Sequence, residues 1–181
     1  MTEATAWERC LSALKRADIS GETYWRSVPR VFQDTALEWI PSFLDGNRYN
    51  PKEEFAALYF AGCNKLAEKE SEGKAKPQYL EPRQTLGFRI TIGGVLDLTD
   101  EENLVRIETE LKVSREEFIQ PAGPTGAGYK TPQEIGRAAY RLNIPGLQVL
   151  TSRPNEEGLD CWHNLALFPA KLISSIISPA P

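Results

Sequence analysis

Apolar residues recur at helical spacing in several parts of the chain. Near the N-terminus, Trp7, Cys10 and Leu14 lie on one helical face, which predicts an amphipathic helix ending near Ala17. A mixed apolar stretch over residues 32–43 predicts an irregular helix that stops at the turn Asp45-Gly46-Asn47. Further helices are expected over residues 64–72, from Thr99 and Asp100 onward, and over residues 131–143.

Runs of alternating, β-branched and aromatic residues predict strands between these helices. They cover residues 24–28, 55–61, 86–92, 95–98, 147–150 and 165–168. Surface loops are expected over residues 73–77 and 121–130, which are rich in glycine and proline. The strands lack the regular alternation with helices of a doubly wound sheet, so the predicted class is α+β. We expect an N-terminal helical extension over residues 1–20, one globular domain over 21–172 and a tail over 173–181.

The composition is that of a folded globular protein, with 41% hydrophobic and 25% charged residues among 181. A net charge of −4 argues against a broad surface for nucleic acid or anionic lipid. The charged N-terminus and the lack of any apolar run of about 18 residues predict neither a secretory signal nor a membrane span. The three cysteines are too widely spaced for zinc ligands or a disulfide framework, so we expect a cytoplasmic protein with no metal.

Two further patterns are weak evidence for catalysis. The segment 123–131 is similar to a phosphate-binding P-loop, but Tyr129 separates its last glycine from Lys130, which favours a flexible loop. Cys161 and His163 lie two residues apart, yet no acid that would orient the imidazole is identifiable. The sequence therefore favours neither a P-loop nucleotide site nor a Cys-His nucleophile.

A series of short motifs resembles the RES domain family in content and in order. The turn Gly46-Asn47-Arg48-Tyr49-Asn50 corresponds to the family's Gly-Gly-Arg-Trp-Asn, and it precedes a strand with Tyr59 and a helix with Ala67-x-x-Glu70. The other matching segments are Tyr24-Trp25-Arg26, Val95 to Thr99, Thr131 to Gly136, Ile144 to Ser152, and Asn164 to Pro169. No single piece is specific, but their common order extends over about residues 24 to 170. The chain departs from the pattern at Asn47 and Tyr49, which replace Gly and Trp.

The resemblance implies an ADP-ribosyltransferase-like fold with a central β-sheet flanked by helices. Family members characterised as toxins break down NAD in the cell that makes them, and an Xre-type antitoxin restrains them. The resemblance therefore implies a toxin of a toxin–antitoxin system that cleaves NAD as its substrate, with no bound cofactor. Water or phosphate would be the acceptor, as in an NAD glycohydrolase or phosphorylase. An ADP-ribosyltransferase that modifies a protein and a non-catalytic NAD-binding protein remain the two alternatives.

The resemblance also implies site residues whose chemistry suits NAD cleavage. The bond between ribose and nicotinamide breaks through an oxocarbenium-like transition state, which a nearby carboxylate stabilises. We expect Glu70 to supply that carboxylate, Arg48 and Arg26 to hold the pyrophosphate, and Tyr59 to stack on a ring of NAD. Arg48, Tyr59 and Glu70 are thus the expected catalytic residues. Arg26 and Ser152 are the expected substrate-binding residues.

Each of these residues also has an ordinary structural interpretation. Arginines beside turns commonly form surface ion pairs, and a tyrosine in an apolar strand is commonly part of the core. Glu68 competes with Glu70 as the carboxylate, but residues two apart on a helix point about 200° apart, so both are not expected at one site. The Ala67-x-x-Glu70 motif favours Glu70. Asn164 is expected to tie loop backbone together rather than to contact substrate.

Overall fold

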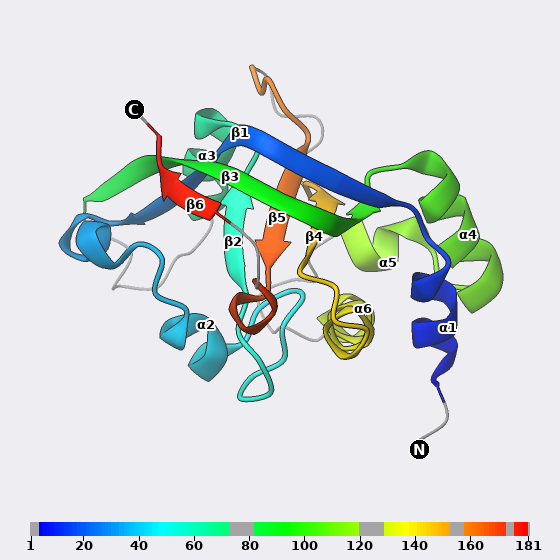
Figure 1. The fold of residues 1–181 in the computed structure, drawn as a ribbon. Helices are drawn as coiled ribbons and strands as arrows, with labels where there is room; N and C mark the ends of the chain where they lie inside the picture. The colour runs from blue at the N-terminus through cyan, green and yellow to red at the C-terminus, as the bar shows by residue number, and fades with distance from the viewer. Residues whose placement is uncertain (1–3, 73–81, 120–128, 153–157, 173–175, 181) are drawn as a thin grey trace.

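Figure 1 shows the computed structural model of the chain, which describes residues 4–72, 82–119, 129–152, 158–172 and 176–180. Its helices are α1 (Ala6–Ser12), α2 (Ile40–Asp45), α3 (Asn64–Glu72), α4 (Glu101–Leu111), α5 (Arg115–Ile119) and α6 (Lys130–Arg141), with short 3-10 helices η1 (Arg30–Thr35) and η4 (Pro169–Lys171). Its strands are β1 (Arg16–Pro29), β2 (Leu58–Ala61), β3 (Arg83–Leu98), β4 (Gly146–Leu150), β5 (His163–Leu167) and β6 (Ile176–Pro179). A sheet with flanking helices in one domain confirms the predicted α+β class.

The strand pairings close into a ring. The order is β1-β2-β5-β4-β3-β6, and β1 also pairs with β3 from Arg16 opposite Leu96 to Pro29 opposite Arg83. Among the described strands, β3 with β4 is the parallel pair and the other pairs are antiparallel. In Figure 1 the long ribbon of β1 and β3 crosses the shorter β2, β5 and β4. Two layers of strands therefore face each other.

The core has two large clusters, an inner and an outer one, which lie on opposite faces of β2 and β5, and a smaller cluster where α3 meets Ala61. The inner cluster joins the β1–β3 ribbon to these strands and includes Tyr24, Val28, Leu58, Phe60, Phe88, Ile90, Leu165 and Leu167. The outer cluster covers the other face with α1, α4 and α6 and includes Leu11, Tyr49, Leu104, Ile107, Ile135, Val149, Ala166 and Phe168. Because successive side chains of a strand point to opposite faces, alternate residues of β2 and β5 belong to the same cluster.

The N-terminal segment differs from the predicted structure. Helix α1 ends at Ser12 rather than near Ala17, and β1 already begins at Arg16. Pairing with β3 satisfies the backbone hydrogen bonds of these residues and overrides their helical pattern. The continuous β1 runs across residue 20, and Leu11 of α1 is fully buried in the outer cluster. Residues 6–20 therefore share the core of the rest of the chain.

Two other segments also depart from expectation. The stretch around 32–43 forms η1 and α2 instead of one helix, and Pro41 lies in the first turn of α2, where its missing N–H costs no helical hydrogen bond. Ile40 and Leu44 of α2 are exposed in spite of their apolar side chains. The predicted break at residues 93–94 is absent, since Gly94 takes a φ of 73° and β3 continues through it. The strand β6 was not predicted.

The expected loop over residues 73–77 and most of the loop over 121–130 lie outside the described residues. In the described ranges, no helix combines the length and the apolar character that crossing a membrane requires.

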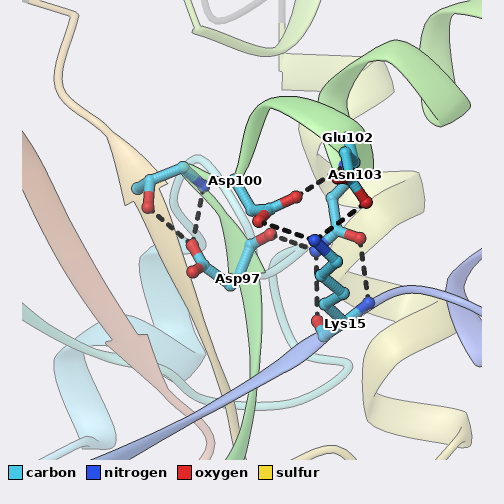
Figure 2. Close-up of polar contacts among 6 residues, drawn as sticks. Lys15, Asp97, Asp100, Glu102 and Asn103 are labelled. Carbon is cyan, nitrogen blue, oxygen red and sulfur yellow. Dashed lines mark hydrogen bonds and ion pairs between the residues drawn. The ribbon is translucent and has the colours of Figure 1, made fainter.

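A buried amide joins the start of β1 to the turn between β3 and α4. Asn103 is 3% exposed; its Oδ1 accepts the backbone N–H of Lys15 at 2.8 Å. Its Nδ2 donates to the backbone carbonyls of Lys15, at 3.1 Å, and Asp97, at 2.7 Å. Figure 2 shows these contacts together with the ion pairs of Lys15 to Asp100 and Glu102. One side chain thus satisfies three backbone groups from two segments.

We predict that Asn103→Ala lowers the free energy of unfolding by about 2 to 4 kcal/mol, because it leaves buried backbone groups without partners. Glu102→Gln is the matched control, since this exposed ion pair contributes at most about 1 kcal/mol. Urea unfolding followed by tryptophan fluorescence measures both. Equal losses in the two variants would contradict the role given to Asn103.

Candidate active site

The turn that carries Arg48 is held tightly by its own backbone. Gly46 ends α2 with a φ of 66°, and a Cβ at this position would lie 2.7 Å from the backbone nitrogen of Lys52. The N–H of Asn47 donates to the carbonyl of Asn50 at 2.7 Å, and the side-chain oxygen of Asn47 accepts the N–H of Arg48 at 2.9 Å. Glycine is therefore required at position 46, as the predicted turn implies.

The hydroxyl of Tyr59 fastens this turn to β2. It accepts the backbone N–H of Tyr49 at 3.0 Å and donates to Oδ1 of Asn50 at 2.8 Å. Asn50 is fully buried and donates in turn to the carbonyls of Ser42 and Phe55. Burial raises the pKa of Tyr59 well above its ordinary value. The hydroxyl is thus engaged by the turn, whereas stacking of the Tyr59 ring on a substrate stays a prediction.

Helix α6 supports the same turn from the other side. Nε2 of Gln133 donates to the carbonyl of Asn47 at 3.1 Å. Gly136 lies directly against the backbone of Tyr49, so that a Cβ at position 136 would overlap the Tyr49 carbonyl. Both residues belong to the segment from Thr131 to Gly136 that the sequence singled out. The physical role of that segment is to hold the Arg48 turn in place.

The guanidinium of Arg48 lies beside the ring of Tyr49, with 5.2 Å from its central carbon to the ring centroid. It also donates to the backbone carbonyl of Ile119 in α5. Tyr49 is only 2% exposed, and burial raises its pKa. The positive charge of Arg48 opposes that shift in pKa, and the negative charge of Glu70 adds to it. Arg48 and Glu70 thus both act electrostatically on the Tyr49 phenol, whereas their action on one bound substrate stays a prediction.

Glu70 lies on the face of α3 that looks toward the sheet. Leu66 and Ala67 on the same face are buried, while Glu68 is exposed; the role of Glu70 as the catalytic carboxylate stays a prediction. Oε1 of Glu70 accepts the hydroxyl of Thr151 at 3.0 Å and Nδ2 of Asn164 at 3.1 Å. Among the described residues, no hydrogen bond reaches Oε2.

Sheet geometry explains why Thr151 and Asn164 meet Glu70. Asn164 of β5 pairs with Ala61 of β2 and with Val149 of β4. Thr151 follows β4, and its N–H continues the ladder to the carbonyl of Trp162 at 2.9 Å. Thr151 therefore shares the face of Val149 and Asn164. Ala61 packs against Leu66 and Ala67 of α3, which places the helix over this face.

The sequence interpretation missed three of these residues. Asn164, expected to tie loop backbone together, donates to Glu70 instead. Thr151 was overlooked although it directly precedes Ser152, and Tyr49 was regarded only as an aromatic replacement. A polar residue that is 1% exposed, as Thr151 is, signals a partner, but burial is not visible in the sequence.

The two expected substrate-binding residues take different positions. Ser152 is half-buried and adjoins Thr151 at the end of β4. Arg26 lies over the ring of Phe60, 5.9 Å from its centroid, and Phe60 faces the inner cluster with Leu165. Because Asn164 points to the opposite face, the structure does not bring Arg26 to the carboxylate of Glu70.

Arg26 nevertheless has the character of an anion ligand. Its Nη1 is buried and has no hydrogen-bond partner among the residues that the structure describes. Burial, and secondarily the charge of Arg83, lower its pKa to about 10. Its contact with pyrophosphate stays a prediction.

His163 and Cys161 do not form a nucleophilic pair. His163 faces the inner cluster, edge-on to Tyr24 at 5.7 Å between ring centroids, and its ring fills the space beside Gly62. Burial lowers the pKa of His163, and Asp97 partly opposes this. Burial raises the pKa of Cys161 to about 12, with Cys63 as a smaller cause, so its thiol stays protonated at neutral pH.

We predict that Gly136→Ala destabilises the protein by about 1 to 3 kcal/mol, because the new methyl group overlaps the Tyr49 backbone. In an ordinary helix the same change stabilises by roughly 1 kcal/mol, so the sign is diagnostic. Arg137→Ala, which removes an exposed ion pair with Glu54, serves as the control. Thermal or urea unfolding that found Gly136→Ala more stable than wild type would rule out this contact.

The lowered pKa of His163 predicts a pH dependence of stability. Because the folded state disfavours the imidazolium, the free energy of unfolding falls as pH drops through about 6.5, the ordinary value, toward the lower folded pKa. His163→Gln removes this contribution while leaving the carboxylates unchanged. Urea unfolding between pH 7.5 and 5 is expected to show a steeper loss for wild type. Parallel curves for the two proteins would be the opposite result.

Comparison with known proteins places this arrangement in a family. The model of the RES domain matches residues 23–180. A chain from the crystal structure of the M. tuberculosis MbcT–MbcA toxin–antitoxin complex has the same fold, with a TM-score of 0.72 and 18% identity over 97% of this chain and 90% of that chain. No curated protein matches the chain. Because the family match extends from β1 to β6 and includes the Arg48 turn, α3 and α6, the chain belongs to the RES domain family.

Proposed function

We propose that this RES-domain protein cleaves the bond between nicotinamide and ribose in NAD. The observation that carries the proposal is the carboxylate of Glu70, held at one oxygen by Thr151 and Asn164. A fixed carboxylate stabilises positive charge at the anomeric carbon, and a hydrogen bond from a ribose hydroxyl to Glu70 aligns the sugar. Nicotinamide leaves as a neutral molecule, so a second carboxylate acting as general acid is not needed.

The cationic side of the proposed site is Arg48. Its planar guanidinium suits the bidentate recognition of a phosphate group, and its turn is braced by Tyr59 and α6. Such bracing keeps the cation at a fixed distance from the carboxylate while the bond breaks. Arg26 is proposed to contribute to binding of the pyrophosphate, and Ser152 to donate a hydrogen bond to a phosphate or ribose group.

The biological role that we propose is that of a toxin which depletes NAD and is restrained by a protein antitoxin of the Xre type. The similarity of the fold to a chain of a toxin–antitoxin complex supports this role, as does membership of the RES family. We also propose that the fold is related to that of ADP-ribosyltransferases. The reaction would then take place in the cytoplasm, where NAD is abundant.

The test is nicotinamide release from NAD by the purified chain, with and without phosphate. We expect Glu70→Gln to reduce the rate by at least about 100-fold, because it removes the charge that stabilises the transition state. Glu68→Gln is the matched control on the same helix, and its exposed side chain predicts an unchanged rate. Dependence on phosphate would identify a phosphorylase.

Full activity of Glu70→Gln would contradict the proposal. Transfer of label from NAD to proteins of a lysate, without release of ADP-ribose or its phosphate, would instead identify a protein-modifying transferase. Binding of NAD with no turnover in either buffer would identify a binding protein.

A further inference from the structure

The carboxylate of Glu70 has two unequal oxygens. Oε1 accepts two hydrogen bonds from neutral donors, whereas Oε2 accepts none from the residues described. One donor, Asn164, belongs to β5, the other, Thr151, directly follows β4, and neither belongs to α3. A glutamate side chain on a helix has several rotatable bonds, so contacts from outside the helix are needed to select one orientation.

From this geometry we infer that Thr151 and Asn164 are positioning residues that hold Oε1 and thereby present Oε2 to the substrate. The inference rests on the proposed function and makes it more specific. Oε2 is the oxygen that accepts the ribose hydroxyl and faces the developing positive charge. Thr151 and Asn164 act through Glu70 and do not themselves touch the reacting atoms.

The placement of Thr151 and Asn164 supports these separate roles for Oε1 and Oε2. Thr151 is 1% exposed, and its position is fixed by the backbone hydrogen bond to Trp162. Asn164 lies in the middle of the sheet, paired on one side with Ala61 and on the other with Val149. Asn164 is therefore held within a strand and Thr151 by the hydrogen bond that extends the ladder beyond β4, and such positions keep a geometry more precisely than a free loop does. Helix α3 packs on the same face through Leu66 and Ala67, so the distance from helix to donors is fixed as well.

The first test separates the hydroxyl of Thr151 from its packing. Thr151→Val keeps the shape and removes the donor, and Thr151→Ser keeps the donor and removes the methyl group. We expect Thr151→Val to lower kcat for nicotinamide release by about 10- to 100-fold, because the carboxylate loses its fixed orientation. KM is expected to change less than about threefold, and Thr151→Ser to recover most of kcat. Thr91→Val, at an exposed position of β3, is the control.

The second test uses charge at position 164. Asn164→Asp replaces the amide donor with a carboxylate next to Glu70, and at pH 8 the two charges repel. As pH falls, one carboxyl takes up a proton and again supplies a donor to its neighbour. We therefore expect the activity of Asn164→Asp relative to wild type to rise between pH 8 and pH 5. A purely structural role for Asn164 predicts no such recovery.

Crystal structures of wild type, Thr151→Val and Asn164→Asp provide a readout that does not depend on activity. The expected result is a single Glu70 conformer in wild type and a turned carboxylate in both variants. The inference is overturned if Glu70 keeps the same orientation in all three proteins, or if Thr151→Ser is as slow as Thr151→Val. If wild type releases no nicotinamide, the proposed reaction is wrong. The orientation of Glu70 in the variant structures then decides by itself whether Thr151 and Asn164 position this side chain.

Discussion

The candidate site depends first on the hydrogen bonds between the hydroxyl of Tyr59 and the turn that carries Arg48. This hydroxyl satisfies the N–H of Tyr49 and one oxygen of Asn50, both of which are buried. Breaking this connection would leave several polar groups in the core without partners, at a cost of about 1 to 3 kcal/mol for each. The turn is therefore fixed by its contacts with the core, which also fix the backbone position of Arg48.

The position of Glu70 has a different origin. Glu70 is placed by the packing of α3 on the sheet, and its Oε1 accepts hydrogen bonds from Asn164 of β5 and from Thr151 directly after β4. Strand alternation sends Asn164 to this face and Leu165 to the inner cluster. The same alternation carries Arg26 to the inner side, over Phe60. The sheet thus places Arg26 on one face and Asn164, the partner of Glu70, on the other, although the motifs that contain them all belong to the same family pattern.

The sequence predicted those elements that depend on residues close together in the chain. Helix α3 has the expected bounds, and the chain turns at Gly46, as expected, with a φ of 66° at that residue. The register of Glu70 followed from helical geometry and the family motif. The start of β1 and the continuity of β3 were missed, because their pairing with each other is a long-range interaction that overrides local propensity. Thr151 and Asn164 could not be assigned for a related reason, since their partner Glu70 is more than 80 residues away along the chain.

The most direct test of the account is a crystal structure of the Glu70→Gln variant with NAD, in which slow turnover preserves the substrate. The account predicts that the pyrophosphate contacts the guanidinium of Arg48 and that a hydroxyl of the nicotinamide ribose lies within hydrogen-bond distance of the side chain at position 70. NAD bound away from the Arg48 turn, or with its nicotinamide ribose pointing away from α3, would contradict it.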